Sequence, residues 1–350
     1  MIPPKHPHVP PGSRNTLPPL PVAVRSLAGH AQTSRSLRIL LTGSSGQLGQ
    51  ALRASQPRQI DGESVELIAT ARCADPEQAQ ARGLWPLDLA DPEACRAAIA
   101  AHRPDWVLNA GAYTAVDRAE AEPELAHAVN AGAPLALAEA LREVCPSAHL
   151  LQISTDFVFS GNQGHPYRPE QEPEPLGVYG ASKAAGERAV AQVFGVGPEG
   201  KATILRTSWV YGPVGQNFLR TMLRLHAQRA ASGEPLRVVA DQVGCPTSTA
   251  GLARACWAVI AQRLSGVLHW SEAGVASWYD FAVAIGELAA AAGLLDHAAL
   301  VEPITSADYP TPARRPAYSL LDCSTSRQRL GLRPQHWRAA LQEVIADVGA

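Results

Sequence analysis

One tyrosine and one lysine stand four residues apart in the segment Tyr179-Gly180-Ala181-Ser182-Lys183. Residues at this spacing lie on one face of a helix, so both side chains can reach a single ligand. The chain has only three lysines, so a chance pairing with a tyrosine here is improbable. A free phenol has a pKa near 10, and an adjacent ammonium lowers it. The pattern predicts a tyrosine that exchanges protons with a substrate, aided by Lys183; the alternative is an exposed aromatic beside a solvated lysine.

A glycine-rich turn with the spacing G-x-x-G-x-x-G follows the apolar run 37–42 and precedes a short helical segment. Gly43, Gly46 and Gly49 let the backbone turn tightly and approach a pyrophosphate, which the amide groups of the helix N-terminus bind. The turn predicts a dinucleotide site, and a plain tight turn is the alternative. In such a site Lys183 could also hold the nicotinamide ribose.

The end of the second strand indicates which dinucleotide is used. An acidic residue there normally binds the 2′-hydroxyl of the adenosine ribose. Here Ala71 takes that position and Arg72 follows it. Loss of the acid and gain of a guanidinium favour a 2′-phosphate, so we expect NADPH over NADH, unless Arg72 points to solvent.

A third polar cluster, Ser154-Thr155-Asp156, comes directly after the apolar run 150–153. The carboxyl ends of parallel strands border the ligand crevice in open α/β sheets. A hydroxyl at this place could donate to a substrate carbonyl oxygen and support Tyr179. These residue types also form ordinary turns, so the prediction depends on their position.

These segments are positioned by strands that alternate with helices. We expect strands at 37–42, 65–69, 84–87, 106–108, 150–153 and 202–205, with helices from Asp91, over 117–144 with a break at Pro134, and from Val178. This order predicts an α/β fold with a doubly wound parallel sheet of the Rossmann type. Helical stretches at 217–230, 248–263 and 277–292, with short strands at 236–239 and 266–269, predict a smaller substrate-binding lobe. We place the dinucleotide-binding domain at 37–210, with some later segments returning to it, and the lobe mainly at 211–350.

Composition restricts the remaining possibilities. The chain has 350 residues and a net charge of −2, which favours no nucleic-acid partner. It contains no apolar stretch long enough to span a membrane, and its six scattered cysteines suit a reducing cytoplasm and show no metal-ligand spacing. Residues 1–36 are proline-rich and contain no acid, so we expect a disordered or extended tail. A dispensable extension is favoured over a transit peptide.

The glycine turn, the strand-end Ser-Thr and the Tyr-x-x-x-Lys pair occur in the order typical of the extended short-chain dehydrogenase/reductases, which the chain resembles. It is most similar to the dTDP-4-dehydrorhamnose reductase family. The segment from Asn109 resembles the family's NAAAYTAVDxAE, and that from Ser154 its STDYVFxG. The other similar segments are Pro175-Leu176, Gly186-Glu187, Arg206–Tyr211, Asn217-Phe218, Asp241–Thr247 and Arg314–Pro316. The resemblance runs from about residue 37 to 345.

The resemblance implies reduction of the C4 ketone of dTDP-4-dehydro-6-deoxy-L-mannose to dTDP-L-rhamnose by NADPH or NADH. By matching position, Tyr179 would protonate the C4 alkoxide, Lys183 would lower the tyrosine pKa and bind ribose, and Thr155 would hold the carbonyl oxygen. Asp156 and Trp209 would contact the nucleotide-sugar. The pyrophosphate of the cofactor would lie along Gly46, Gln47 and Leu48. Its adenine and ribose side would be lined by Asp88, Leu89, Ala112, Tyr113 and Thr114.

Two residues depart from the family pattern. Phe157 stands where the family usually has tyrosine, and Ala71 replaces the usual acid.

A sister reductase giving 6-deoxy-L-talose is one alternative function. A non-catalytic regulatory homologue, like the beta subunit of methionine adenosyltransferase, is another, although the intact Tyr179, Lys183 and Thr155 favour an enzyme. The family also suggests Mg²⁺ at a subunit contact and a possible homodimer, but no acidic cluster here assigns metal ligands.

Overall fold

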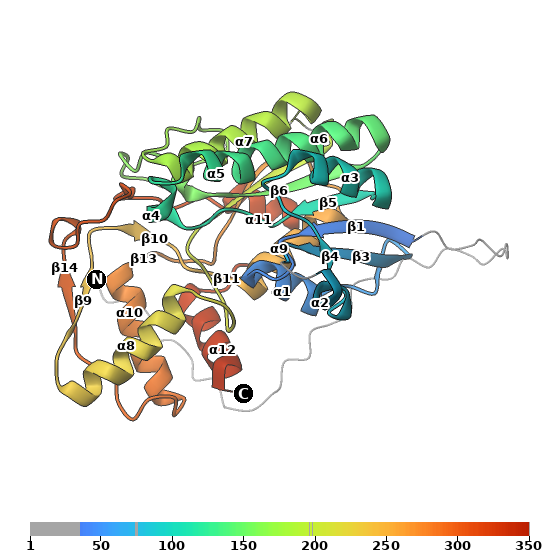
Figure 1. Ribbon diagram of the computed structural model, residues 1–350. Helices are drawn as coiled ribbons and strands as arrows, with labels where there is room; N and C mark the ends of the chain where they lie inside the picture. Colours follow the sequence, from blue (N-terminus) through green and yellow to red (C-terminus); the bar gives the residue numbers. More distant parts are fainter. Residues whose placement is uncertain (1–35, 74–75, 196, 198, 350) are drawn as a thin grey trace, which may run out of the picture. The chain divides into compact units, whose positions relative to one another are not determined.

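A sheet of eight strands lies at the centre of the computed structural model, which describes residues 36–73, 76–195, 197 and 199–349 (Figure 1). Its strands follow the order β12-β7-β6-β5-β1-β3, with β4 parallel and β2 antiparallel to β3. All other pairings are parallel, so the predicted doubly wound parallel sheet is confirmed. The strands are β1 (Ser36–Thr42), β2 (Gln59–Ile60), β3 (Glu63–Ala71), β4 (Trp85–Pro86), β5 (Trp106–Asn109), β6 (His149–Thr155), β7 (Ala202–Thr207) and β12 (Gly266–Trp270).

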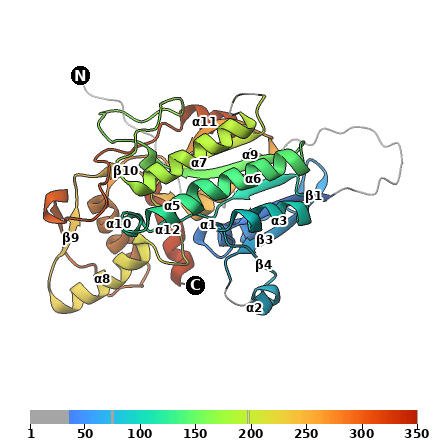
Figure 2. The same cartoon turned by 45° about the horizontal axis from the view of Figure 1, so that its top comes forward.

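Alternating side chains of the central strands pack on two helical layers. Leu40 of β1 faces one cluster, formed with α3 (Pro92–His102), α6 (Ala133–Val144) and α7 (Val178–Phe194). Its neighbours Ile39 and Leu41 face the other cluster, formed with α1 (Gln47–Ala54) and α9 (Thr249–Ala261). Figure 2 shows α6 and α7 side by side along the sheet. The strands are therefore buried on both faces, as parallel sheets require.

The helical stretch expected over 117–144 is divided differently from the prediction. It consists of α4 (Val116–Ala119), α5 (Pro123–His127), a π-helical turn (Ala128–Gly132) and α6. Pro134 does not break it, because it lies in the first turn of α6 directly after the π turn. The interruption falls before Pro123, since a proline disfavours helical backbone in the residue preceding it. The short α2 (Pro76–Ala81) follows β3.

The C-terminal part builds a further hydrophobic cluster around α8 (Phe218–Ser232), α10 (Trp278–Ala291) and α12 (Trp337–Gly349). Beside them β9 (Leu236–Val239) and β14 (Val301–Ile304) pair in parallel. The predicted strand 266–269 belongs instead to the main sheet as β12, and α9 packs there too. The remaining elements are β8 (Val210–Tyr211), β10 (Val243–Gly244), β11 (Thr247–Ser248), β13 (Ala276–Ser277), α11 (Ser324–Leu330) and the 3-10 turns Asp156–Val158 and Ser306–Asp308.

Two predicted boundaries, at residues 37 and 210, delimit the dinucleotide-binding domain. The prediction of a disordered tail over 1–36 lies outside the described residues, except for Ser36, which begins β1 one residue earlier than expected. The division at residue 210 stays a prediction about domains.

Candidate active site

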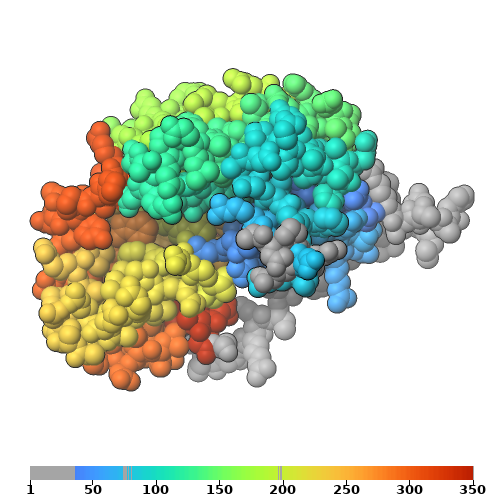
Figure 3. All heavy atoms as spheres, viewed as in Figure 1, coloured from blue at the N-terminus to red at the C-terminus, as the bar shows by residue number. Residues whose placement is uncertain are grey.

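All of the predicted site residues line one cavity of about 870 Å³ between the glycine turn and the C-terminal cluster. In Figure 3 the surface is recessed between α5 and α8, which border this region. From the N-terminal part the cavity takes Gly43, Gly46, Gln47, Leu48, Gly49, Arg72, Asp88, Leu89, Ala112, Tyr113 and Thr114, and from later segments Thr155, Asp156, Tyr179, Lys183 and Trp209. The topology therefore brings together residues that the sequence spreads over nearly half of the chain.

The glycine turn is shaped by close backbone contacts. Gly43 has a positive φ of 66°, and a Cβ on it would lie 2.6 Å from Cα of Gly111 after β5. A Cβ on Gly49 would lie 2.6 Å from Cα of Ser44. At Gly46 only the carbonyl oxygen of Gly43 lies within 4 Å of such an atom, and the side facing the cavity is open. Gly46 is the N-cap of α1 and makes no side-chain cap bond, so the first amides of α1 are available to an anionic ligand.

A strap formed by Gln216 and Asn217, just before α8, crosses this turn. Nδ2 of Asn217 donates to Oε1 of Gln47 over 2.7 Å, and Nε2 of Gln47 donates to the carbonyl of Gln216 over 3.3 Å. Oδ1 of Asn217 accepts the amide of Arg220 and so caps α8. Sequence reasoning missed Asn217 as a site residue, because its partner lies 170 positions away.

The end of β3 supports the expected placement of Arg72. Ala71 is buried, whereas the Arg72 side chain is exposed at the cavity wall. Next to the end of β3, Oδ1 of Asp88 accepts the amide of Ala90 over 2.9 Å, which holds the turn after β4. A cationic group without an acid at the strand end is the arrangement that suits a 2′-phosphate.

Tyr179 lies in the first turn of α7, and Lys183 one turn later on the same side. Nζ of Lys183 donates to the carbonyl of Ile153 over 2.7 Å, which ties α7 to the end of β6. Burial lowers the pKa of Lys183 to about 8, and Glu187 acts in the opposite direction. Burial raises the pKa of Tyr179 to about 12, while a hydrogen bond with Thr155 lowers it. The expected lowering of the tyrosine pKa by Lys183 is therefore not found, because desolvation of the phenol dominates.

The first turn of α7 is anchored by polar side chains that the sequence analysis did not single out. Oγ of Ser182 donates to the carbonyl of Tyr179 over 2.8 Å and accepts from Nδ2 of Asn130 over 3.0 Å. Oδ1 of Asn130 accepts the amide of Tyr113 over 2.9 Å. Asn130 thus connects α7 to the loop after β5. The only signal in the sequence is a polar residue within an alanine-rich helix.

Asp156 and Thr155 end β6 next to Tyr179. Asp156 is 1% exposed, and its Oδ1 accepts from Oγ1 of Thr155 over 3.1 Å. Burial raises the pKa of Asp156 to about 7, although hydrogen bonds from Ser319 and Thr155 act in the opposite direction. Phe157 contacts the Tyr179 ring edge-on, with ring centres 5.6 Å apart. The wall around the phenol is therefore apolar on the side where the family usually has a hydroxyl.

Trp209 reaches the cavity through an uncommon backbone conformation. Its φ is 46°, in the left-handed region that residues with bulky side chains rarely adopt. Its ring stacks on Trp278 at 3.6 Å between centres and 8° between planes. Nε1 of Trp278 donates to Oε1 of Gln242 over 3.2 Å, which fixes the Trp278 ring. A Cβ on Gly244 would lie 2.8 Å from the Trp209 indole, so only glycine fits there without displacement.

Within 36–73, 76–195, 197 and 199–349, no three His, Cys, Asp or Glu side chains are grouped so that they could hold a metal ion. The described helices include none with the length and apolar character needed to cross a bilayer.

Comparison with known proteins gives a consistent assignment. Residues 37–350 match the family model described as the RmlD substrate binding domain. The chain is 42% identical over 312 residues to the dTDP-4-dehydrorhamnose reductase of Streptomyces griseus, covering 87% of this chain and 92% of that protein. It is 40% identical over 314 residues to a probable dTDP-4,6-dihydroxy-2-methyloxan-3-one 4-ketoreductase of Streptomyces antibioticus, covering 89% of this chain and 96% of that protein.

A solved structure agrees with these relatives. The dTDP-4-dehydrorhamnose reductase of Bacillus anthracis, crystallised in complex with NADP, superimposes with a TM-score of 0.75 at 31% identity and covers 89% of this chain and all of its own. The chain belongs to the dTDP-4-dehydrorhamnose reductase (RmlD) family, the NAD(P)-dependent reductases of dTDP-sugar biosynthesis.

Proposed function

We propose that the protein reduces the C4 ketone of dTDP-4-dehydro-6-deoxy-L-mannose to give dTDP-L-rhamnose, with NADPH preferred over NADH. The observation that supports this most directly is the convergence of Tyr179, Thr155 and Lys183 on the cavity that also contains the glycine turn. The identity to named dTDP-4-dehydrorhamnose reductases supports the substrate.

The cavity suits a dinucleotide along its whole length. Gly43 and Gly49 allow the close backbone packing of the turn, and the uncapped start of α1 presents amides where a pyrophosphate would lie. Asn217, from the C-terminal part, is hydrogen-bonded to Gln47 at this place. The nicotinamide of a cofactor bound in this cavity would supply the hydride.

The protein's own residues handle the proton. Tyr179 would donate its phenolic proton to the oxygen at C4 as that oxygen gains negative charge. A pKa of about 12 keeps the phenol protonated at neutral pH, which is the form that a proton donor needs. Thr155, hydrogen-bonded to the same phenol, would orient it and hold the carbonyl oxygen. Lys183, fixed by the carbonyl of Ile153, would hold the ribose and face the phenolate once the proton has left.

The choice of NADPH depends on Arg72 at the end of β3. The Bacillus anthracis relative crystallised with NADP supports a 2′-phosphate in this fold. Asp156 and Trp209 would contact the nucleotide-sugar beside Tyr179, since both line the same cavity.

A second candidate is reduction of a different dTDP-linked 4-ketosugar. It is favoured by the Streptomyces antibioticus 4-ketoreductase, whose 40% identity to this chain lies between the 34% and 42% of two named dTDP-4-dehydrorhamnose reductases. Phe157 adds to it, because an apolar ring in place of the usual tyrosine changes the hydrogen bonds offered to a sugar.

The test is oxidation of NADPH and of NADH, followed by absorbance, with enzymatically prepared dTDP-4-dehydro-6-deoxy-L-mannose and identification of the product sugar. Oxidation that yields dTDP-L-rhamnose supports the proposal. A 6-deoxy-L-talose product would move the protein to the sister activity. Absence of oxidation in a folded protein that binds the cofactor would refute it, and the ketosugar of the second candidate would then be tried.

A further inference from the structure

The helix that carries Tyr179 begins at a residue that cannot cap it. Gly177 occupies the N-cap position of α7 and makes no side-chain hydrogen bond. The first amides of a helix have no partner within the helix, and the N-cap side chain normally supplies one. Here the amide of Val178 donates to Oε1 of Glu120 over 2.9 Å, from a residue 58 positions earlier. The cap of α7 therefore comes from the end of α4.

Gly177 fits this carboxylate by its lack of a side chain. Its backbone is extended, with φ −140° and ψ 176°, a conformation open to any residue. A Cβ on it would lie 2.6 Å from Oε1 of Glu120. The absence of a side chain at Gly177 thus leaves space for the carboxylate, which also interacts favourably with the positive end of the helix dipole.

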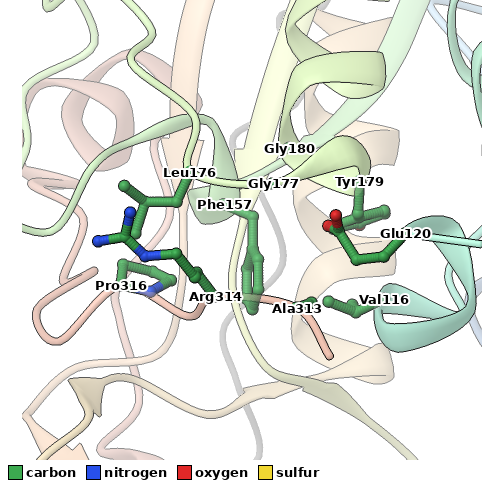
Figure 4. Close-up of a pocket in the computed structure, with 10 residues that line it drawn as sticks. All are labelled: Val116, Glu120, Phe157, Leu176, Gly177, Tyr179, Gly180, Ala313, Arg314 and Pro316. Atoms are coloured by element: carbon green, nitrogen blue, oxygen red, sulfur yellow. The ribbon is translucent and has the colours of Figure 1, made fainter. Parts of the chain in front are cut away.

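The opposite side of this turn is held as closely. A Cβ on Gly180 would collide with the carbonyl oxygen of Phe157, so the helix and the end of β6 are in direct backbone contact. Figure 4 shows the small pocket that these residues enclose, with Glu120 and Tyr179 to one side of Phe157 and Arg314 to the other. The turn that carries Tyr179 is held between Glu120 and Phe157.

The helix α4 has a second partner in the C-terminal part of the chain. Nη2 of Arg315 donates to Oδ2 of Asp117 over 2.8 Å, and the amide of Ala313 donates to Oδ1 over 3.3 Å. The short α4 and its C-cap residue Glu120 therefore hold both the start of α7 and the segment beside the cavity that contains Arg315.

We propose that Glu120 is a positioning residue that holds the first turn of α7, and with it Tyr179, at the place from which the phenol reaches the substrate. The inference rests on the proposed reduction for its kinetic consequence and on the contact between Glu120 and Val178 for its structural one. Glu120 itself is not among the residues that line the large cavity.

The kinetic test compares Glu120→Ala and Glu120→Gln with Glu124→Ala, which removes an exposed glutamate four residues along the chain. We expect Glu120→Ala to lower kcat about tenfold, the effect of losing one N-cap bond. KM and the Kd for NADPH should stay within about twofold of wild type, because the binding walls are intact. Glu120→Gln keeps a side-chain oxygen and should recover most of kcat, and Glu124→Ala should match wild type.

A double-mutant cycle separates positioning from general damage. Gly177→Ala displaces the carboxylate without removing it and should lower kcat to the level of Glu120→Ala. In the double variant the new Cβ meets no carboxylate, so no further loss is expected. Losses that multiply would show that the two residues act independently and would overturn the proposal.

Amide hydrogen exchange at residues 178–181 provides a reading that needs no substrate. We expect about tenfold faster exchange in Glu120→Ala and unchanged exchange in Glu124→Ala. Faster exchange with unchanged kcat would make Glu120 a structural cap only and overturn the positioning role, as would unchanged exchange. If the wild type itself turns over no ketosugar, the proposed function fails, while the exchange measurement still decides whether Glu120 caps α7.

Discussion

The preference for NADPH can be tested at Arg72, the cationic residue at the end of β3. Its side chain is exposed at the cavity wall, so its attraction to a 2′-phosphate is felt through water rather than through a dry interior. At about 4 Å in water a pair of unit charges interacts with about 1 kcal/mol. A phosphate with a charge near −2 therefore gains about 2 kcal/mol. That free energy corresponds to roughly 30-fold in Kd.

The assay is the Kd of NADPH and of NADH for wild type and Arg72→Ala, measured by the fluorescence of the reduced nicotinamide. We expect about a 30-fold weaker Kd for NADPH and little change for NADH, which has no 2′-phosphate. The difference should shrink greatly at 1 M salt, where the Debye length is about 3 Å. Arg53→Ala is the matched control, because Arg53 is an exposed arginine of α1 that does not line the cavity.

Two results would refute this reasoning. Equal losses for both cofactors in Arg72→Ala would show that Arg72 does not contact the 2′-phosphate. A loss of NADPH affinity in Arg53→Ala as large as in Arg72→Ala would show that the effect comes from net charge and not from the position of the guanidinium.

Three further predictions concern the catalytic and binding residues. Tyr179→Phe should lower kcat by about 10² to 10⁴ with an unchanged Kd for NADPH, and unchanged turnover would end the assignment of the proton donor. Asp156 has a pKa raised to about 7, so its carboxyl is protonated below that pH and ionised above it. The KM of the ketosugar should therefore fall as pH rises through 7, since a carboxylate accepts hydrogen bonds from hydroxyls more strongly, and Asp156→Asn should lose this inflection. Serine in the variant Asn217→Ser can still cap α8 but cannot reach Gln47. The Kd for NADPH should therefore rise about fivefold, with kcat unchanged at saturating cofactor. An unchanged Kd would show that the strap does not retain the dinucleotide.

The features that were predictable from the sequence are those that local pattern determines. The glycine turn needs only its place between a strand and a helix, and Tyr179 and Lys183 need only a helical spacing, so both were expected and both line the cavity. The contact of Trp209 with Trp278 joins residues from different elements and depends on a left-handed backbone, which no local pattern indicates. The prediction of a helix break at Pro134 was wrong, because a π turn directly precedes α6 and Pro134 lies in the first turn of that helix.

The pKa of Tyr179 was unpredictable for a different reason. The sequence showed Lys183 as its neighbour, but the extent of burial is set by segments far along the chain, and Lys183 donates to Ile153. The outcome was therefore opposite to the expectation, with the phenol pKa raised to about 12 and that of the lysine lowered to about 8.

These two shifts have one cause, and both fit the order of steps in the proposed reduction. Burial disfavours the charged form of each group, so the site at rest holds a neutral phenol that is ready to donate. Once the proton has moved to the oxygen at C4, the phenolate is an anion in that same buried place, and Lys183 is the nearby group able to offset it. The ammonium therefore contributes most when the proton is in transit and least in the resting site. An interaction that strengthens only on the way to the transition state accelerates the reaction, whereas one already present at rest would not.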